Sequence, residues 1–188
     1  MKNVILIHGM PSKEEYFAHG QTELNQHWFP WLSQQLEKNH VNLNMPNMPV
    51  PYEPEYNAWK EVFEKFPLNE ETVLIGHSCG GGFLIRYLSE NDVRVGNVIL
   101  VAPWLDLEHI LQTGMFDFKI NENILTKAKD IKMFYSIDDY IEILKSVEKI
   151  KSEIPGIKTV EYTNRGHFTF EPGYEINKTF PELLELVV

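Results

Sequence analysis

A serine lies between two glycines, directly after a short apolar run, in the stretch Gly76-His77-Ser78-Cys79-Gly80. This box fits the G-x-S-x-G pattern of a nucleophile elbow, in which a sharp strand-to-helix turn exposes the serine hydroxyl. Glycines are needed on both sides because a side chain at either place would collide with the neighbouring helix or strand. The alternative is a glycine-rich turn with a surface serine. A strand before the box, a helix after it and a base elsewhere in the chain would favour the nucleophile.

A serine hydroxyl needs a general base before it can act as a nucleophile. His167 follows the last predicted strand and lies between a glycine and an aromatic residue, so we predict that it is the base. His77 adjoins the serine, but neighbours on a sharp turn point apart. His8 ends the first predicted strand. The other histidines have no strand-end context and are interpreted as surface or packing residues: His19, His27, His40 and His109.

A carboxylate that orients the histidine should lie between serine and histidine in the chain order of this type of triad. Asp138 and Asp139 come just after the predicted strand Ile131–Ser136. Either aspartate could cap the helix that follows while the other holds the imidazole. Asp106 also lies past a strand end and is a further candidate. The residues therefore predict a Ser-His-Asp triad at three strand ends and leave the choice of acid open.

Two backbone N–H groups are needed to hold the negative oxygen that forms when a serine attacks a carbonyl group. One is the N–H of Cys79, directly after the serine and at the start of a predicted helix. The other should come from the loop after the first strand, and we predict the N–H of Met10. The thiol of Cys79 is a rival nucleophile, but the elbow exposes Ser78 instead.

The segment Trp104–Asp130 is the only sizeable stretch available to cover such a site. It is shorter than a separate cap domain, so we expect a shallow pocket that takes a small acyl group. We expect four residues to line this pocket: His8, Gly9, Trp104 and Phe116.

The elements that must position these residues alternate along the chain. Short apolar runs predict six strands: Asn3–Ile7, Val41–Pro46, Thr72–Gly76, Asn97–Pro103, Ile131–Ser136 and Gly156–Thr163. Amphipathic stretches predict helices within these ranges: Trp28–Asn39, Pro54–Phe66, Gly82–Asn91, Asn121–Lys129, Tyr140–Ile154 and Gly173–Val188. This pattern predicts an α/β fold with a mostly parallel sheet of about six strands and helices on both faces. We expect one domain, residues 1–188, without a separate cap domain.

Charge and cysteine content exclude several classes of protein. The formal net charge is −10 and the pI is about 5.2, which argues against a nucleic-acid partner because phosphate binding needs a basic face. The single cysteine, Cys79, allows neither an intrachain disulfide nor a metal site of several thiolates. The apolar run Val4–Ile7 is too short for a signal peptide or a membrane span. We therefore expect a cytoplasmic protein without a membrane partner.

The sequence resembles the α/β-hydrolase superfamily, and within it the small serine hydrolases similar to retinoblastoma-binding protein nine. The resemblance covers nearly the whole chain and rests on the motifs LIHG, HWFPWL, GHSCGG, APW, SIDD and RGHF. It implies a triad of Ser78, Asp139 and His167, because the second aspartate of the pair is the acid in this family. The family usually has a proline soon after that pair, whereas this chain reads DDYIEI. Members of the family are thought to hydrolyse small esters and some peptide-like or amide substrates.

Together these observations predict a serine hydrolase that cleaves small ester or amide substrates through an acyl-enzyme. This chemistry needs no metal or organic cofactor, and the expected partner is a small acyl substrate. Nothing in the sequence indicates a protein partner. Esterase, thioesterase, amidase and peptidase activities share the triad, so the residues do not separate them. The alternative is a catalytically idle hydrolase-fold protein that acts as a protein-binding module.

Overall fold

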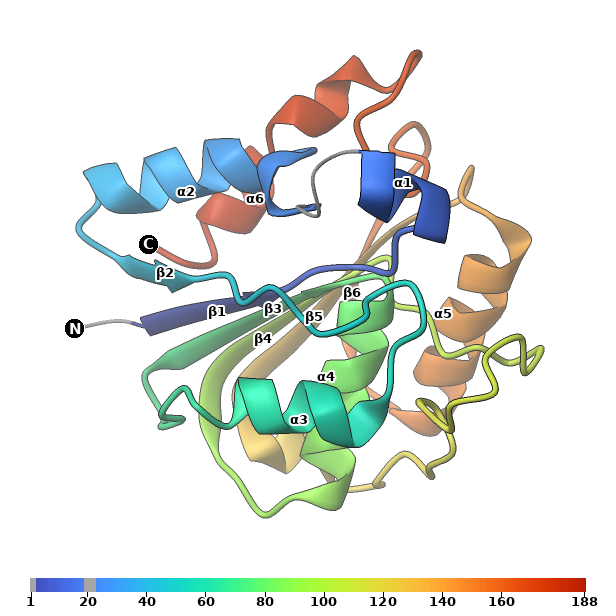
Figure 1. The fold of residues 1–188 in the computed structure, drawn as a ribbon. Coiled ribbons are helices and arrows are strands. Elements are labelled where there is room, and N and C mark those ends of the chain that lie inside the picture. The colour runs from blue at the N-terminus through green and yellow to red at the C-terminus, as the bar shows by residue number, and fades with distance from the viewer. Residues whose placement is uncertain (1–2, 19–22) are drawn as a thin grey trace.

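The computed structural model describes residues 3–18 and 23–188, so His19 lies outside the described residues. Within these ranges one sheet contains six strands: β1 (Asn3–Ile7), β2 (Asn42–Asn44), β3 (Thr72–His77), β4 (Val95–Val101), β5 (Ala128–Ser136) and β6 (Lys158–Tyr162). All neighbouring strands pair in parallel, in the spatial order β2-β1-β3-β4-β5-β6 (Figure 1). The α/β fold and the parallel sheet predicted from the sequence are therefore confirmed.

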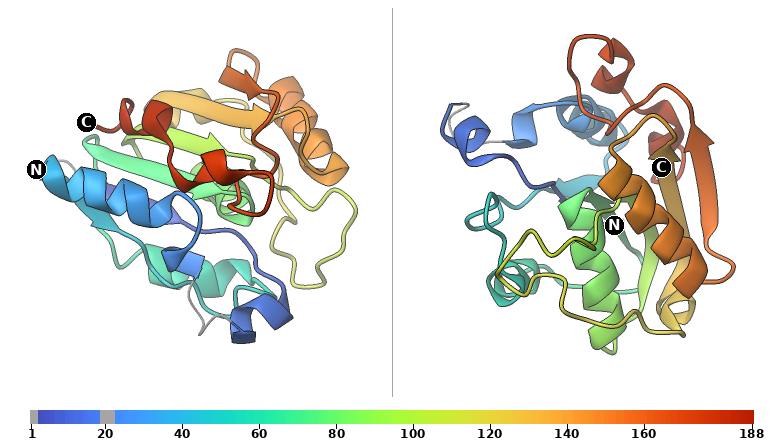
Figure 2. Two further views of the ribbon diagram at one scale, coloured as in Figure 1. Left: turned by 90° about the horizontal axis from the view of Figure 1, so that it is seen from above. Right: turned by 90° about the vertical axis from the view of Figure 1, so that its right-hand side faces the viewer.

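Helices cover both faces of this sheet (Figures 1 and 2). One face carries α2 (Phe29–Lys38) and α6 (Pro181–Leu184). The opposite face carries α3 (Tyr56–Phe63), α4 (Cys79–Glu90) and α5 (Ile141–Glu153). The short helix α1 (Lys13–Ala18) follows β1 and lies beyond its carboxyl end. Short 3-10 helices occur at three further places: η1 (Glu23–Asn25), η2 (Ile124–Lys127) and η3 (Glu175–Lys178).

The structure corrects the predicted helices at two places. The helix expected within Asn121–Lys129 is the short 3-10 helix η2, because the chain enters β5 at Ala128. The C-terminal stretch divides into η3 and α6, and Pro181 lies in the first turn of α6, where its missing N–H breaks no helical hydrogen bond. Helix α4 begins at Cys79, as expected for the residue that follows the elbow serine, so tertiary packing overrides the low helix propensity of its three glycines.

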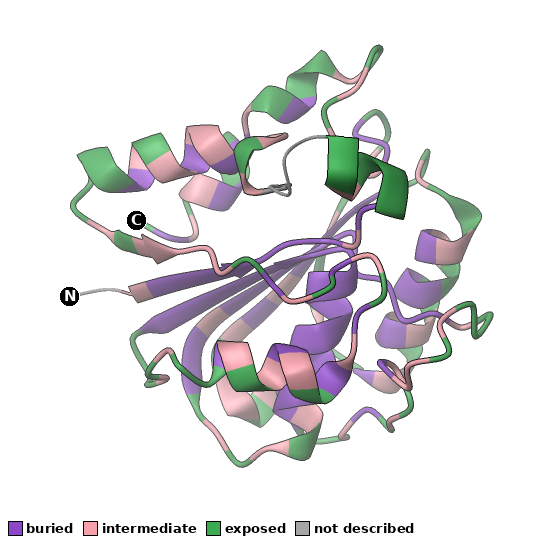
Figure 3. Cartoon of the chain, in the orientation of Figure 1, coloured by how far each residue is buried: buried purple, intermediate pink, exposed green. Residues whose placement is uncertain are grey.

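The sheet order places a crevice beside the end of β3. Every residue of β3 and four of the five residues of β1 are buried (Figure 3), which explains their unbroken apolar runs. Strands β1 and β3 are neighbours in space, with Ile7 opposite Gly76, although β2 separates them in the chain. Ligands of parallel sheets bind where the strand order reverses in this way, at the carboxyl ends of the strands.

Candidate active site

Ser78 occupies the sharp turn between β3 and α4, with a φ of 52° and a ψ of −119°. A positive φ is costly for a residue other than glycine, by about 1–3 kcal/mol, and persists only where surrounding contacts enforce it. Those contacts are backbone hydrogen bonds. The N–H of Ser78 donates to Val101 O at 2.9 Å, and its carbonyl accepts from the N–H groups of Gly81 at 2.9 Å and Trp104 at 3.0 Å. The turn thus has the strained geometry of a nucleophile elbow.

The glycines around Ser78 lie where a side chain would meet backbone. A Cβ atom on Gly76 would lie 2.6 Å from Gly80 O, and one on Gly80 would lie 2.3 Å from Ile7 O. A Cβ atom on Gly82 would lie 2.0 Å from Trp104 O. The prediction that the flanking glycines permit close packing of helix and strand is confirmed. The extra glycine at position 82 lets the chain after β4 pack against α4.

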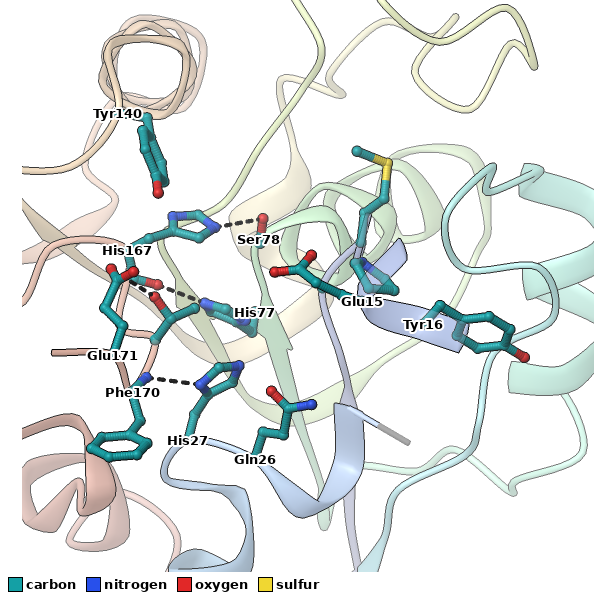
Figure 4. A pocket seen from close by; sticks show the side chains of 14 residues that line it. Glu15, Tyr16, Gln26, His27, His77, Ser78, Tyr140, His167, Phe170 and Glu171 are labelled. Carbon is teal, nitrogen blue, oxygen red and sulfur yellow. Dashed lines mark hydrogen bonds between the residues drawn. The ribbon is translucent and has the colours of Figure 1, made fainter. Parts of the chain in front are cut away.

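The structure brings Ser78, His167 and Asp139 into one hydrogen-bonded chain. The Ser78 Oγ and His167 Nε2 atoms are 2.9 Å apart (Figure 4). The other ring nitrogen, Nδ1, lies 3.0 and 3.1 Å from the two carboxylate oxygens of Asp139. Because Nδ1–H donates to the carboxylate, Nε2 is free to accept the serine proton. The side chain of Asp139 is fully buried, so water does not compete for this contact.

Asp138 has a different position from Asp139. Its carboxylate accepts hydrogen bonds from the Ser136 hydroxyl, from Gly166 N at 3.0 Å and from the Tyr174 hydroxyl at 3.1 Å. Burial raises the pKa of Asp138, but these three hydrogen bonds outweigh it and hold the pKa below its ordinary value. Asp138 therefore connects Gly166, the residue before His167, to the end of β5 through hydrogen bonds.

Two expectations about the carboxylates are wrong. Neither Asp138 nor Asp139 is the N-cap of α5, which is Tyr140 and has no side-chain cap. Asp106 is not the carboxylate beside His167 either. Asp106 is buried, and its two oxygens accept from the N–H groups of the residues at positions 110 and 111, both at 2.8 Å, and so close a separate loop.

Residues 165–170, termed here the histidine loop, are held by side chains that are remote in sequence. On one side, Ser136 Oγ accepts from Arg165 N at 3.0 Å and Asp138 accepts from Gly166 N. On the other side, the buried amide of Asn177 donates to Arg165 O at 2.8 Å and to Thr169 O at 2.9 Å. The loop has no regular secondary structure, so these contacts replace the hydrogen bonds of a helix or strand.

Two histidines complete the support of the histidine loop. His77 Nε2 donates to the carbonyl oxygen of His167 at 2.8 Å, and His27 Nδ1 accepts from Phe170 N at 2.8 Å (Figure 4). Burial first, and then the nearby His167, hold the pKa of His77 well below its ordinary value, so His77 is neutral. His27, interpreted as a surface or packing residue, packs against Phe29 and also supports this loop, and His40 and His109 are exposed as expected.

The peptide after β1 lies against the serine. A Cβ atom on Gly9 would lie 3.2 Å from Ser78 Cβ. His8 is buried, and its Nε2 accepts from Met48 N at 3.1 Å, so Nδ1 carries the proton and donates to Gly9 O at 2.8 Å. In a trans peptide the N–H points away from the C=O, so Met10 N–H points away from His8. His8 therefore orients the Gly9–Met10 peptide; its predicted place in the pocket lining is wrong.

A cavity of about 420 Å³ opens beside Ser78 (Figure 4). Its lining among the described residues is Gly9, Met10, Pro11, Glu15, Tyr16, Gln26, His27, His77, Ser78, Tyr140, His167, Thr169, Phe170 and Glu171. The cover comes from α1, from the turn before α2 and from the histidine loop with the residue after it. The prediction that the segment after β4 covers the site is wrong.

Trp104 and Phe116 were expected in the pocket and do not line it. Their rings pack edge to face, with centroids 5.5 Å apart, and Phe116 lies against Gly82 of α4. They belong to the packing around α4 because the glycine surface of that helix leaves room for them. Sequence reasoning also missed α1, although Ser12 and Glu15 have the spacing of a capping box.

Metal-binding clusters and membrane-spanning helices are both absent from the described residues. No group of three or more His, Cys, Asp or Glu side chains in residues 3–18 and 23–188 is arranged to hold a metal ion. No helix in the described part of the chain is long and apolar enough to cross a membrane.

Known proteins resemble this chain in sequence and in fold. Residues 17–186 match the family described as "Serine hydrolase". YdeN of Bacillus subtilis (strain 168) is 29% identical over 174 residues, which cover 87% of this chain and 90% of YdeN. The rat (Rattus norvegicus) protein named serine hydrolase RBBP9 is 28% identical over 85% of this chain and 84% of its own length. The crystal structure of YdeN superposes with a TM-score of 0.81 at 24% identity, over 99% of this chain and 96% of YdeN.

Proposed function

Because the chain belongs to the serine hydrolase family, we propose that it cleaves small esters or amides through an acyl-enzyme formed on Ser78. The hydrogen-bonded chain Ser78–His167–Asp139 carries this proposal. Ser78 Oγ attacks the carbonyl carbon while its proton passes to His167 Nε2. Asp139 keeps the other ring proton on Nδ1 and stabilises the imidazolium that forms.

The negative oxygen of the tetrahedral intermediate needs donors close to Ser78. We assign this role to the backbone N–H groups of Cys79 and Met10. Cys79 directly follows Ser78 and is the first residue of α4, where the helix dipole favours negative charge. The hydrogen bond from His8 to Gly9 O supports the assignment of Met10, because it fixes the orientation of that peptide.

The two half-reactions follow from this arrangement. When the C–O or C–N bond breaks, His167 returns its proton to the departing alcohol or amine, and the acyl group stays on Ser78. A water molecule then attacks the acyl-enzyme while His167 takes one of its protons. The bond to Ser78 Oγ breaks, His167 returns the proton to that oxygen, and the carboxylic acid leaves. The cavity volume of about 420 Å³ supports a small acyl substrate. The choice among ester, thioester, amide and peptide depends on the leaving group, which these residues do not determine.

A fluorophosphonate probe, which reacts with activated serines, tests the nucleophile. We expect labelling of the wild-type protein and of a control variant, Ser152→Ala, which removes an exposed hydroxyl at the end of α5. We expect no labelling of Ser78→Ala. Labelling that survives in Ser78→Ala would overturn the assignment. A folded wild type that is neither labelled nor active on p-nitrophenyl esters would favour the catalytically idle, protein-binding alternative.

A further inference from the structure

Two carboxylates face the cavity from different elements. Glu15 comes from α1 and Glu171 directly follows the histidine loop, and Figure 4 shows them on either side of the Ser78–His167 pair. The cavity lining in the described residues includes no lysine and no arginine. At neutral pH, formal negative charge therefore faces a substrate from two sides of the scissile bond.

Both carboxylates are held near the cavity by local contacts. Glu15 Oε2 accepts from Ser12 N at 2.8 Å, while Ser12 Oγ accepts from Glu15 N at 3.1 Å, so Glu15 is fixed in a capping box. Glu171 is 3.5 Å from the Thr169 hydroxyl, and no ion pair found among the described residues involves it. Lys178 lies over the Phe170 ring, 4.4 Å from its centroid, and is not part of the cavity lining.

The Tyr140 side chain lies close enough to Glu15 and Glu171 for their negative charges to act on its hydroxyl. Tyr140 lines the same cavity and is close to the triad, with its ring centroid 5.7 Å from that of His167. Burial raises the pKa of Tyr140 first, and the negative charges of Glu171, Asp139 and Glu15 raise it further. Carboxylates from three segments therefore act on one point of the cavity wall.

Aromatic rings add a second kind of attraction for cations. Tyr16, Tyr140 and Phe170 all line the cavity. The face of an aromatic ring carries partial negative charge and attracts ammonium and guanidinium groups. Carboxylates and aromatic side chains around one cavity together suit a cationic group and disfavour an anionic one.

We infer that the cavity selects acyl substrates that carry a cationic group, an ammonium or a guanidinium, over neutral and anionic substrates of the same shape. This inference rests on the proposed hydrolase function, since it names the substrate class of that site. The cationic group would lie between Glu15 and Glu171 while the carbonyl carbon lies at Ser78 Oγ. No new covalent step is involved, because the cation contributes only to binding.

Three p-nitrophenyl esters of equal length test the selectivity. The first is the ester of γ-trimethylammoniobutyric acid, the second replaces the quaternary nitrogen by carbon, and the third carries a γ-sulfonate. We expect kcat/KM for the cationic ester to exceed that for its neutral isostere by about tenfold at low ionic strength. The sulfonate should be the poorest substrate. Added salt should reduce the preference, because ions screen partly exposed charges.

Substitution of the carboxylates assigns the preference to these side chains. Glu171→Gln and Glu15→Gln should each lower the cationic-to-neutral ratio by about threefold, and the double variant should bring it near one. Glutamine can also complete a capping box, so Glu15→Gln retains the cap of α1. Glu14→Gln, a neighbouring exposed carboxylate outside the cavity lining, is the matched control and should leave the ratio unchanged.

The outcomes separate this inference from the proposed function. Hydrolysis of all three esters at equal kcat/KM, or a ratio that the double variant leaves unchanged, would overturn the cation preference and leave the hydrolase intact. A folded wild-type protein that hydrolyses none of the esters and resists the fluorophosphonate would instead overturn the proposed function.

Discussion

The serine and the histidine of the candidate site are held in place by different kinds of contact. Ser78 is fixed by backbone: its turn is hydrogen-bonded to β4 and α4, and Gly80 allows α4 to touch the end of β1. The histidine loop is fixed by side chains. His77 binds the carbonyl group of His167, 90 residues away in the sequence. His27 binds the N–H group of Phe170, 143 residues away.

This difference determines how the elbow and the histidine loop should each respond to substitutions. The elbow tolerates almost no added volume, because its neighbours are backbone atoms of a sheet that cannot move aside without breaking ladder hydrogen bonds. The histidine loop depends on the donors and acceptors of Ser136, Asp138, Asn177, His77 and His27. It should therefore weaken gradually as single hydrogen bonds are removed.

The largest contrast should come from the adjacent aspartates. Asp139→Asn removes the negative charge and exchanges one acceptor oxygen for an NH2 donor. The His167 tautomer is then no longer fixed, and kcat should fall by about 10⁴-fold. Asp138→Asn only loosens the backbone before His167 and should lower kcat by about tenfold, because small misplacement of a catalytic group is costly but not fatal. The measurement is kcat on a p-nitrophenyl ester with each variant, after circular dichroism has established that both are folded.

The reverse order of these losses would mean that Asp138 is the acid in solution. Equal losses would mean that the two carboxylates act as one unit, and the distinction between them would then fail.

On the elbow side, Gly80→Ala should strongly destabilise the fold. The added methyl group would lie 2.3 Å from Ile7 O and 2.6 Å from His8 O, and β1 is paired with strands on both sides. We expect the free energy of unfolding to fall by about 3 kcal/mol, since overpacking against backbone cannot be relieved by a side-chain rotation. Urea unfolding measures this change. An unfolding midpoint equal to that of wild type would show that α4 and β1 separate readily.

The elbow was predictable from sequence for the same reason that it is rigid. Its apolar strand, its glycines and its serine are contiguous, so one short stretch of sequence contains every residue of the elbow. The strands and most helices were predictable because their patterns are also local. The predicted triad partners followed from the rule that functional residues gather at the carboxyl ends of parallel strands.

The support of the histidine loop and the wall of the cavity were not predictable in this way. The role of His27 depends on a backbone N–H 143 residues away, and nothing near His27 in the sequence indicates that partner. Trp104 and Phe116 follow a strand end, yet they pack against the glycines of α4 and not in the cavity. The capping box at Ser12 and Glu15 was the one local signal for α1 that could have been used.

Asn177→Ala tests how the histidine loop responds when one of its supporting side chains is removed. Asn177 is fully buried, and its loss would leave the carbonyl groups of Arg165 and Thr169 without these donors. We expect the free energy of unfolding to fall by about 2 kcal/mol, the usual cost of unsatisfied buried polar groups. Urea unfolding is again the measurement. Asn57→Ala, which removes an exposed amide at the start of α3, should change stability by less than about 0.5 kcal/mol.

A loss for Asn177→Ala as large as that expected for Gly80→Ala would remove the distinction between the two halves of the site. It would show that the histidine loop is as intolerant of change as the elbow.

The last expected effect is a pH dependence of stability that arises from His77. Its pKa in the folded protein lies well below the ordinary value of 6.5, so the unfolded chain binds the proton more readily. The stability contributed by neutral His77 is thus fully present above pH 6.5 and is lost as the pH falls below it, by at most about 1.4 kcal/mol per pH unit. His77→Gln keeps an amide donor for His167 O but does not titrate. Urea unfolding between pH 7 and pH 5 should therefore show a steeper loss for wild type than for His77→Gln, whereas parallel curves would mean that His77 takes up a proton inside the folded site.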